Sequence, residues 1–271
     1  MLFKAWRHKG VQGAEQIEAI GMQVMATVNY VPRADSRTNS KTQQTQSILA
    51  LTDPGNIAVE AFRSIRTSLH FGMLDTRANT LLLTSAAPGA GKSFTAVNLA
   101  VVMAQAGKKV CLIDADLRRG HLRKYFNKAK NTPGLTEYLI EEKTIDEVVY
   151  PGPVDGLSFI PTGRYPPNPA DVLERHLMKD LLAGLNARFD MVILNAPPVL
   201  AVSDPVILGR LSDALLFVAR FDETPLGEID ASQRILTTAG LKVTGAILNG
   251  FDPSKATGSS YSYRYEYKTD A

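Results

Sequence analysis

The sequence predicts an α/β fold in which helices cover both faces of a mostly parallel sheet. Short, continuous apolar runs of strand length alternate along the chain with segments whose apolar residues recur at helical spacing. Strands that are apolar throughout are typical of sheets buried on both faces. Hydrophobic residues make up 45% of the 271 residues and charged residues 21%, which is typical of a globular protein.

The expected elements alternate from the first helix onward. Helical spacing at residues 57–71 predicts that helix, and Gly107 and Gly240 stand where two later helices are expected to end. The expected strands cover residues 81–83, 110–113, 157–160, 191–194, 215–218 and 243–248. The expected later helices cover residues 94–106, 171–185, 205–211 and 226–239.

Composition divides the chain into three parts. Residues 35–47 include no apolar side chain, so we expect a linker there and a compact domain that begins near Ile48. Residues 14–31 mix a short helical pattern with a strand-like one. The predicted parts are an N-terminal segment with a polar linker at 1–47, the compact domain at 48–251 and a flexible tail at 252–271.

The net charge of +3 lies in the N-terminal part. Residues 1–47 hold six Lys and Arg against three Asp and Glu, whereas residues 48–271 hold 24 of each. A near-neutral body argues against nucleic acid as a partner, because affinity for duplexes comes from neutralised phosphates. The basic residues around Trp6 suit either a solvated end or a stretch just inside a membrane. Cys111 is the single cysteine, which excludes a disulfide framework and is typical of a reducing compartment.

The strongest local signal is a glycine-rich turn between an expected strand and an expected helix. Residues 85–93 read Ser-Ala-Ala-Pro-Gly-Ala-Gly-Lys-Ser. Backbone N–H groups of such a turn and of the helix N-terminus bind the β- and γ-phosphates of a nucleotide. Lys92 would bring a positive charge to those phosphates, and Ser93 a hydroxyl ligand to Mg²⁺. Ala86 stands where the usual phosphate loop has its first glycine.

Two carboxylates, Asp114 and Asp116, end the next expected strand. They lie at the carboxyl edge of the predicted sheet, where open α/β folds bind ligands. Because side chains alternate along a strand, the two point to the same side. One can hold a metal ion while the other accepts a proton from an incoming hydroxyl group, although an acidic strand end also suits a helix cap. A further expected strand ends in Asn195, where another metal-positioning acid is expected.

Taken in order, these motifs resemble those of the bacterial tyrosine kinases, autokinases that control capsule and exopolysaccharide export. The phosphate loop, the Asp-x-Asp-x-Arg strand end and a strand followed by Pro-Pro occur at similar spacing. Residues 60–66 resemble the family's E-x-x-R-x-x-R oligomerisation motif, and residues 163–169 its proline-rich loop. The tyrosine cluster at 261–267 is similar to its autophosphorylation segment. The resemblance covers about residues 50–271, and residues 1–34 resemble the stretch after the second membrane helix in the fused type.

The resemblance implies a three-layer fold of the P-loop NTPase type and an ATP-dependent, Mg²⁺-dependent tyrosine autokinase. It would phosphorylate its tyrosine cluster in trans within a head-to-tail, homo-oligomeric ring and so regulate polysaccharide polymerisation and export. Further implied partners are a cognate phosphotyrosine phosphatase, the polysaccharide export machinery and a membrane-spanning region of its own or of a partner chain. The implied location is the cytoplasmic face of the bacterial inner membrane.

These motifs define the predicted site residues by role. The predicted catalytic residues are Lys92, Asp114, Asp116 and Asn195, and the predicted metal ligands are Ser93, Asp114 and Asp116. The predicted nucleotide-binding residues are Pro88, Gly89, Ala90, Gly91, Lys92, Ser93, Phe94 and Asn249, the last by its likeness to an adenine-contacting position. The predicted oligomerisation residues are Glu60, Arg63 and Arg66. The predicted phosphate acceptors are Tyr261, Tyr263, Tyr265 and Tyr267.

Asn195 departs from the family, which usually has aspartate there. An amide keeps one acceptor oxygen but loses the negative charge, so we expect ATP to bind and transfer to be slowed. A nucleotide-binding pseudokinase scaffold is therefore one alternative function. A partition-type P-loop ATPase is another, although it would carry a lysine at Ala87 and lack the tyrosine cluster. Local ion pairs remain the alternative for residues 60–66, an edge strand for 261–267 and a strand-end turn for Asn249.

Overall fold

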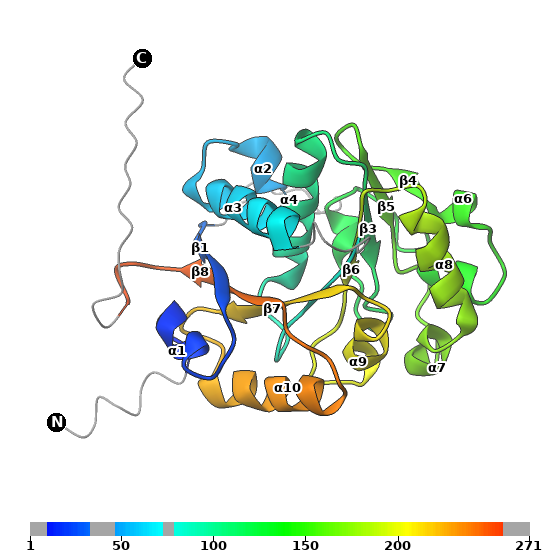
Figure 1. Ribbon diagram of the computed structural model, residues 1–271. Coiled ribbons are helices and arrows are strands. Elements are labelled where there is room, and N and C mark those ends of the chain that lie inside the picture. The colour runs from blue at the N-terminus through cyan, green and yellow to red at the C-terminus, as the bar shows by residue number, and fades with distance from the viewer. Residues whose placement is uncertain (1–9, 33–46, 73–78, 257–271) are drawn as a thin grey trace, which may run out of the picture.

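A mixed sheet runs through the middle of the protein, with helices on both faces (Figure 1). The computed structural model describes residues 10–32, 47–72 and 79–256. The strands lie in the order β1-β8-β7-β2-β6-β3-β5-β4, and all neighbours are parallel except β4 and β5. The strands are β1 (Val24–Asn29), β2 (Thr80–Thr84), β3 (Val110–Asp114), β4 (Tyr150–Pro151), β5 (Leu157–Ile160), β6 (Met191–Asn195), β7 (Ala214–Arg220) and β8 (Gly245–Phe251).

Helices of very different length connect these strands. The longest, α3, α4 and α10, have 16, 14 and 13 residues. The helices are α1 (Ala14–Glu18), α2 (Leu49–Thr52), α3 (Ile57–Gly72), α4 (Lys92–Gln105), α5 (Leu135–Leu139), α6 (Ile145–Val148), α7 (Pro169–Leu173), α8 (His176–Asn186), α9 (Asp204–Gly209) and α10 (Leu226–Thr238), with a 3-10 turn η1 at Leu122–Lys124.

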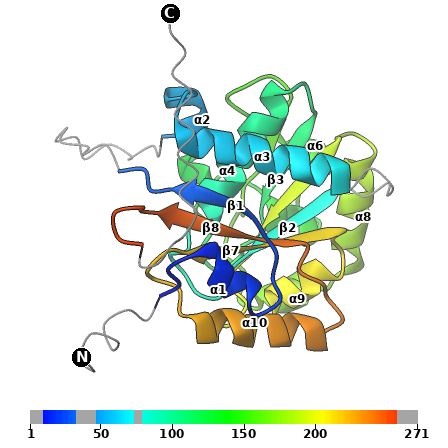
Figure 2. The same ribbon diagram turned by 60° about the vertical axis from the view of Figure 1, so that its left-hand side comes forward.

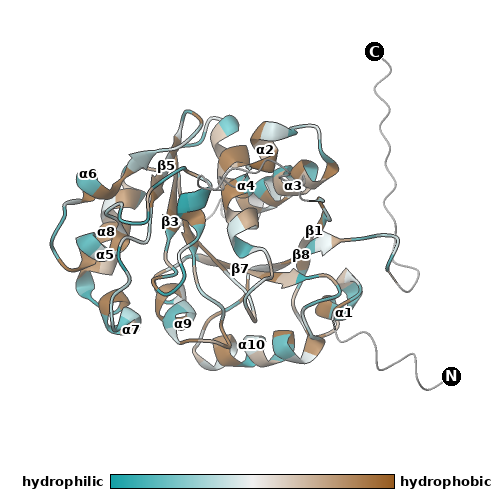
Figure 3. Cartoon of the chain, turned by 180° about the vertical axis from the view of Figure 1, so that it is seen from behind, coloured by the Kyte–Doolittle hydropathy of each residue, from teal (hydrophilic) through white to brown (hydrophobic). Residues whose placement is uncertain are grey.

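The sheet separates two hydrophobic cores, which makes three layers. Leu81 and Leu83 of β2 belong to the core beneath α3 and α4, and Leu82 between them belongs to the core beneath α8 and α10. This alternation is expected because successive strand side chains point to opposite faces. Figure 2 shows α3 and α4 on one side of the strands and α9 and α10 on the other, and Figure 3 shows that hydrophobic residues predominate in the central strands. The predicted α/β class is therefore confirmed.

All the expected strands are present, with shifted ends, and one expected helix is divided. The strand expected at 243–248 begins at Gly245 and continues to Phe251. The helix expected at 171–185 is two helices, α7 and α8, because the backbone at Arg175 is extended, with ψ of 145°. The short elements β4, α5 and α6 were not expected, since periodicity needs longer segments. Thr144 and Glu147 form a capping box at α6, and this Thr-x-x-Glu spacing is a signal that sequence analysis missed.

The packed domain begins earlier than the start expected near Ile48. β1 pairs with β8 in the sheet, and Ile17, Met22 and Val28 are at most 2% exposed. Only one of the six residues of β1 is buried, as is typical of an edge strand, so its sequence pattern is weak. Elements on both sides of the polar stretch therefore share one fold. The predicted acceptor tyrosines and residues 1–9 lie outside the described residues.

None of the helices in the part of the chain that the structure describes is both long enough and apolar enough to cross a membrane.

We expect Ile17→Ala to lower the free energy of unfolding by about 2–4 kcal/mol, because it empties a fully buried position in the core. Urea denaturation measures this change. Ile57→Ala is the matched control, since Ile57 is 56% exposed and its truncation should cost less than about 0.5 kcal/mol. Equal effects of the two substitutions would show that residues before 48 do not contribute to the cooperative fold.

Candidate functional site

Three neighbouring strands bring the predicted site residues together. β6 lies between β2 and β3, and the register pairs Asn195 with Leu83 on one side and with Asp114 on the other. Because the three strands are parallel, the segments that follow them emerge at the same edge of the sheet. The glycine-rich turn after β2 therefore lies beside Asn195 and Asp114, which are 81 residues apart in sequence.

The turn between β2 and α4 has the backbone of a phosphate-binding loop. Gly89 and Gly91 both have φ of 90°, a conformation that glycine adopts without steric cost. A Cβ atom on Gly91 would lie 2.0 Å from Nδ2 of Asn249, so no side chain fits there. Ala86 is fully buried and does not have a positive φ, so its position does not require glycine. Within the described residues, no acceptor bonds the N–H groups of Gly89, Ala90 or Gly91, which leaves them available to an anion.

Two of the predicted nucleotide-binding side chains support the loop itself. Asn249 is 2% exposed, and its Nδ2 donates a hydrogen bond to the carbonyl oxygen of Ala90 at 2.9 Å. The ring of Phe94 packs edge-on against Phe62 of α3, with centroids 5.8 Å apart. Asn249 thus fixes the turn from the end of β8, a contact that sequence analysis missed. The predicted adenine contact of Asn249 stays a prediction.

Lys92 is a nearly buried cation at the first residue of α4. Its side chain is 9% exposed and has no hydrogen-bond partner among the residues described. Burial lowers the pKa of Lys92, and the nearby carboxylates of Asp116 and Asp114 act in the opposite direction. A buried ammonium group without a bonded counter-ion favours an incoming anion. The phosphates of a nucleotide would supply that anion.

Asp114 is a buried carboxyl group at the end of β3. It is 1% exposed, and it accepts hydrogen bonds from the N–H of Leu122 at 2.9 Å and from Nδ2 of Asn195 at 3.3 Å. Burial raises the pKa of Asp114 to about 7, although the hydrogen bond from Leu122 acts to lower it. Oδ1 of Asn195 is buried without a partner in the described part of the chain. An unpaired oxygen beside a buried carboxyl group favours a cation or a donor at this place.

The oxygen ligands around this point fit Mg²⁺. Hydroxyl, carboxylate and amide oxygens of Ser93, Asp114, Asp116 and Asn195 are the hard donors that Mg²⁺ prefers. Among the described residues, no group of three His, Cys, Asp or Glu side chains could hold a metal ion by itself. The ion would therefore need phosphate oxygens or water as further ligands, as is usual for Mg²⁺.

The loop after Asp114 is held by an ion pair that sequence analysis missed. Nε and Nη2 of Arg118 each donate to a different carboxylate oxygen of Asp204, both at 3.0 Å. Asp204 is fully buried at the start of α9, where the helix dipole favours a negative charge. Oδ1 of Asp116 accepts the N–H groups of Arg118 at 3.1 Å and Arg119 at 2.8 Å. The 86 residues between Arg118 and Asp204 leave no local sequence signal for this pair.

The segment after β5 closes the other side of Asp114. Oγ1 of Thr162 donates a hydrogen bond to the carbonyl oxygen of Asp114 at 3.1 Å. A Cβ atom on Gly120 would lie 2.0 Å from that hydroxyl oxygen, so this approach requires glycine. The hydroxyl of Tyr165, which is 47% exposed, donates to the carbonyl oxygen of Gly120 at 3.3 Å. Thr162 and Tyr165 are therefore part of the site, although sequence analysis did not predict them.

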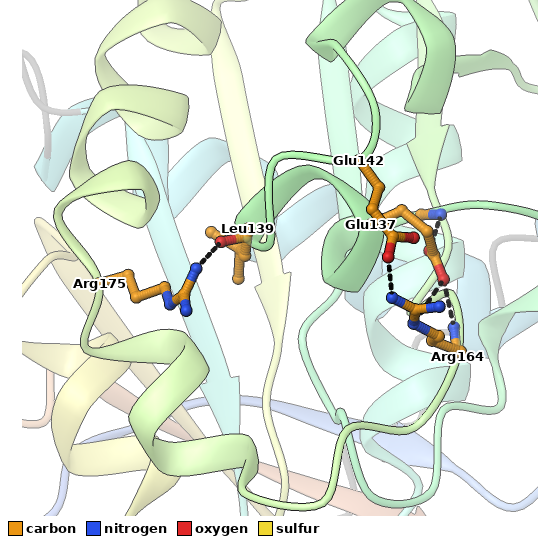
Figure 4. A network of polar contacts seen from close by, with 6 residues as sticks. Glu137, Leu139, Glu142, Arg164 and Arg175 are labelled. Carbon is orange, nitrogen blue, oxygen red and sulfur yellow. Dashed lines mark hydrogen bonds and ion pairs between the residues drawn. The ribbon is translucent and has the colours of Figure 1, made fainter.

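A buried glutamate fixes the predicted proline-rich loop at residues 163–169 (Figure 4). Glu137 of α5 accepts hydrogen bonds from the N–H of Gly134 at 2.7 Å and from the N–H of Arg164 at 3.0 Å. The guanidinium group of Arg164 also pairs with Glu137, at 3.9 Å, and with Glu142. The loop beside Thr162 is thus anchored to α5 by side-chain and backbone contacts.

The predicted oligomerisation residues lie on α3, away from the strand ends. Arg63 pairs with Glu60 in the same helix, and it also donates a hydrogen bond to the carbonyl oxygen of Pro54 at 3.1 Å. Arg66 donates to the carbonyl oxygen of Val102 at 3.4 Å. These contacts within one chain agree with the alternative of a helix stripe with local ion pairs. A role in oligomerisation stays a prediction.

Fold and site together define a nucleotide-binding α/β domain of the P-loop class. A family model described as an AAA domain matches residues 79–224. A putative tyrosine-protein kinase in the cps region of Klebsiella pneumoniae is 40% identical over 259 residues, which cover 92% of this chain and 35% of that protein. The tyrosine-protein kinase etk of Escherichia coli (strain K12) is 40% identical over 274 residues, 97% of this chain and 37% of that protein.

A solved structure extends the likeness to three dimensions. The kinase domain of the Escherichia coli tyrosine kinase ETK is 41% identical, with a TM-score of 0.85 that covers 94% of this chain and 100% of that one. The chain belongs to the family of bacterial tyrosine kinases. It spans 35% to 37% of the length of the two curated relatives, which are longer proteins.

We expect the stability of the fold to depend on pH through Asp114. Its pKa of about 7 lies above the value of about 3.9 for an unfolded aspartate, so the unfolded chain releases this proton first as pH rises. Folding stability should therefore fall as pH rises from about 4 to about 7. In Asp114→Asn this fall should be smaller, as thermal unfolding at several pH values would measure.

Asp116→Asn is the control for this measurement, because Asp116 is partly exposed whereas Asp114 is buried. It should keep the pH dependence of the parent chain. If the parent and both variants lost stability equally over this range of pH, Asp114 would not be the responsible group.

Proposed function

We propose that this chain is an ATP-dependent protein tyrosine kinase domain that phosphorylates the tyrosine cluster at residues 261–267. The observation that carries the proposal is the buried, unpartnered ammonium group of Lys92 beside the two carboxylates of Asp114 and Asp116. An anion-binding loop next to an acidic strand end suits transfer of a phosphoryl group to a hydroxyl group. The likeness to tyrosine-kinase domains supports tyrosine as the acceptor.

Each residue of the site has a role in this proposal. The N–H groups of the turn at 89–91 bind the β- and γ-phosphates, and Lys92 neutralises charge on the phosphoryl group in transit. Ser93 and Asp114 would hold Mg²⁺, which would neutralise further phosphate charge when bound. Asp116, the more exposed carboxylate, accepts the phenol proton as the phenol oxygen bonds to the γ-phosphorus and ADP leaves.

Asn195 favours slow transfer in the chain as it stands. Its amide nitrogen donates to Asp114 where a carboxylate would add negative charge, so the site attracts a cation less strongly. This amide is also the observation that favours the second candidate function, a nucleotide-binding scaffold without turnover. Both candidates predict nucleotide binding, and they differ in phosphate incorporation.

We expect Asn195→Asp to raise autophosphorylation and to change ATP affinity by less than about tenfold, or about 1.4 kcal/mol. The added carboxylate restores charge at the metal site but does not touch the phosphate-binding turn. Mass spectrometry of the tyrosine cluster after incubation with Mg-ATP measures incorporation, and calorimetry measures affinity. Equal incorporation in both chains would show that Asn195 is a harmless replacement.

Lys92→Met is the control for this experiment. It should abolish phosphotyrosine and strongly weaken ATP binding, since it removes the cation that meets the phosphates. If the parent chain and Asn195→Asp both bound ATP but incorporated no phosphate, the scaffold function would hold instead. Unchanged ATP affinity in Lys92→Met would contradict the assignment of the phosphate loop.

The proposal extends to assembly, partners and place. We propose a head-to-tail ring in which one subunit phosphorylates the tail of the next, with a cognate phosphatase to reverse the reaction. An extended chain spans at most about 3.3–3.6 Å per residue, so the residues after Ala256 can reach beyond their own subunit. The cps region in the name of one relative supports a role in capsule or exopolysaccharide export at the cytoplasmic face of the membrane.

We expect the unphosphorylated chain to sediment as a large oligomer and Arg63→Glu to sediment as a monomer with slow tail phosphorylation. Reversing this charge removes a side chain that is 34% exposed on the proposed contact helix. Arg234→Glu is the matched control, because Arg234 also pairs with an acid of its own helix, Asp230 on α10. If the Arg63→Glu monomer phosphorylated its tail as fast as the parent at equal dilution, transfer would occur within one chain.

A further inference from the structure

A strongly basic segment follows the catalytic carboxylates. Between Asp116 and Glu137 the sequence holds six Lys and Arg and no Asp or Glu, although the whole chain holds nearly equal numbers. All six lie within residues 118–130, which we call the basic segment. A run of this kind is either a solvated surface or a site for an anionic partner.

The basic segment is fixed at the strand ends rather than extended into solvent. Its residue Leu122 donates its N–H to Asp114, and the ring of Phe126 stacks on Phe159 of β5 with centroids 4.1 Å apart. Since β5 lies on the far side of β3 from the phosphate-binding turn, the basic segment lies on the side of Asp114 opposite the nucleotide. An acceptor tyrosine has to approach from this open side.

Four of the six cations have no acidic partner. Arg118 pairs with Asp204, and the ammonium group of Lys128 lies 4.3 Å from the centre of the Tyr150 ring. Within the described residues, no ion pair involves the remaining cations, which are Arg119, Arg123, Lys124 and Lys130. Nε of Arg123 is moreover buried without a hydrogen-bond acceptor in that part of the chain. A buried donor of this kind favours an acceptor from outside.

Arg123 and Lys130 line a small hollow together with Thr162 and Tyr165. The room inside it is about 10 Å³, which is enough for one water-sized group such as a single phosphate oxygen. An anion would therefore lie at the mouth of the hollow and place one oxygen inside. Arg123 and Lys124 also lie near enough to His121 to lower its pKa, after burial, and Lys92 contributes as well. The positive charges thus surround the place where transfer is proposed to occur.

We propose that the basic segment binds the phosphorylated form of the tyrosine cluster, with the phosphate of one phosphotyrosine between Arg123 and Lys130. This inference rests on the proposed function for its choice of ligand. Residues 257–271 hold two basic and two acidic side chains, so the unmodified tail offers no net charge to the basic segment. Each phosphate adds about −1.5 to −2 charges, and guanidinium groups bind phosphate with paired hydrogen bonds. The basic segment therefore favours the product of transfer over the substrate.

Binding of two labelled peptides to the full chain tests this proposal. Both peptides have the sequence of residues 257–271, and one carries phosphate on Tyr265. Saturating ADP keeps the phosphate-binding turn filled and excludes transfer. We expect the phosphopeptide to bind at least about tenfold more tightly in fluorescence anisotropy, which corresponds to about 1.4 kcal/mol. Equal affinity for the two peptides would overturn the proposal.

The double variant Arg123→Gln/Lys130→Gln should lose most of this preference. Arg210→Gln/Lys242→Gln is the matched control, because it removes the same charge from two exposed residues that precede β7 and β8, at the opposite edge of the sheet. The control should bind the phosphopeptide like the parent. Lys130→Gln alone alters one exposed side chain, so it should fold normally and show a partial loss. Equal losses in the two double variants would mean unspecific attraction and would overturn the proposal.

Two competing anions are separated in the same design. If phosphopeptide binding occurred only without ADP, the phosphate would be bound at the turn after β2 and the proposal would fail. If Arg123→Gln/Lys130→Gln lost binding to phosphatidylserine vesicles but kept the phosphopeptide, the basic segment would serve a membrane surface instead. Because no transfer takes place, a chain without kinase activity still gives a clear binding result. Kinase activity without a preference for the phosphopeptide would contradict this inference alone.

Discussion

The carboxyl group of Asp114, from which water is excluded, ties together the segments that make the site. A buried carboxyl group costs free energy unless its oxygens are hydrogen-bonded. Here the N–H of Leu122 and the amide of Asn195 meet its side chain, and the hydroxyl of Thr162 meets its carbonyl oxygen. These partners come from η1 and from the ends of β6 and β5, the two neighbours of β3. The strand order is therefore what makes the burial of Asp114 tolerable.

Asn195 changes the balance between stability and activity at this point. A carboxylate there would lie beside Asp114 and repel it, whereas the amide donates a hydrogen bond to it. The amide thus stabilises the fold without a metal ion and weakens the attraction for one. Active sites often carry such a conflict, because groups that repel one another in the empty site bind the ligand together. The unpartnered Oδ1 of Asn195 shows that the amide satisfies only part of its surroundings.

Local patterns predicted the parts of the site that each lie within a few residues. The strand before Asp114 and the turn before Lys92 are continuous in sequence, so apolar runs and glycine spacing were enough to place them. Thr162 and Asp204 were missed because each acts on a residue more than 40 positions away, through contacts that the strand order creates. β1 was placed outside the domain because an edge strand buries little. Glu137 follows Gly134 at capping-box spacing, so a local signal for it did exist.

The two sides of Asp114 differ in the kind of anion that they suit. On the side of β2, backbone N–H groups and one buried lysine surround a small volume, which suits phosphates that must be held in one orientation. On the side of β5, the cations of the basic segment are partly exposed, which suits a ligand that arrives neutral and leaves charged. Attraction that appears only after transfer does not recruit the tail; it retains it. The tyrosines at 261, 263, 265 and 267 are two residues apart, about 7 Å in an extended chain, so a tail held by one phosphate would present its next tyrosine close to Asp116.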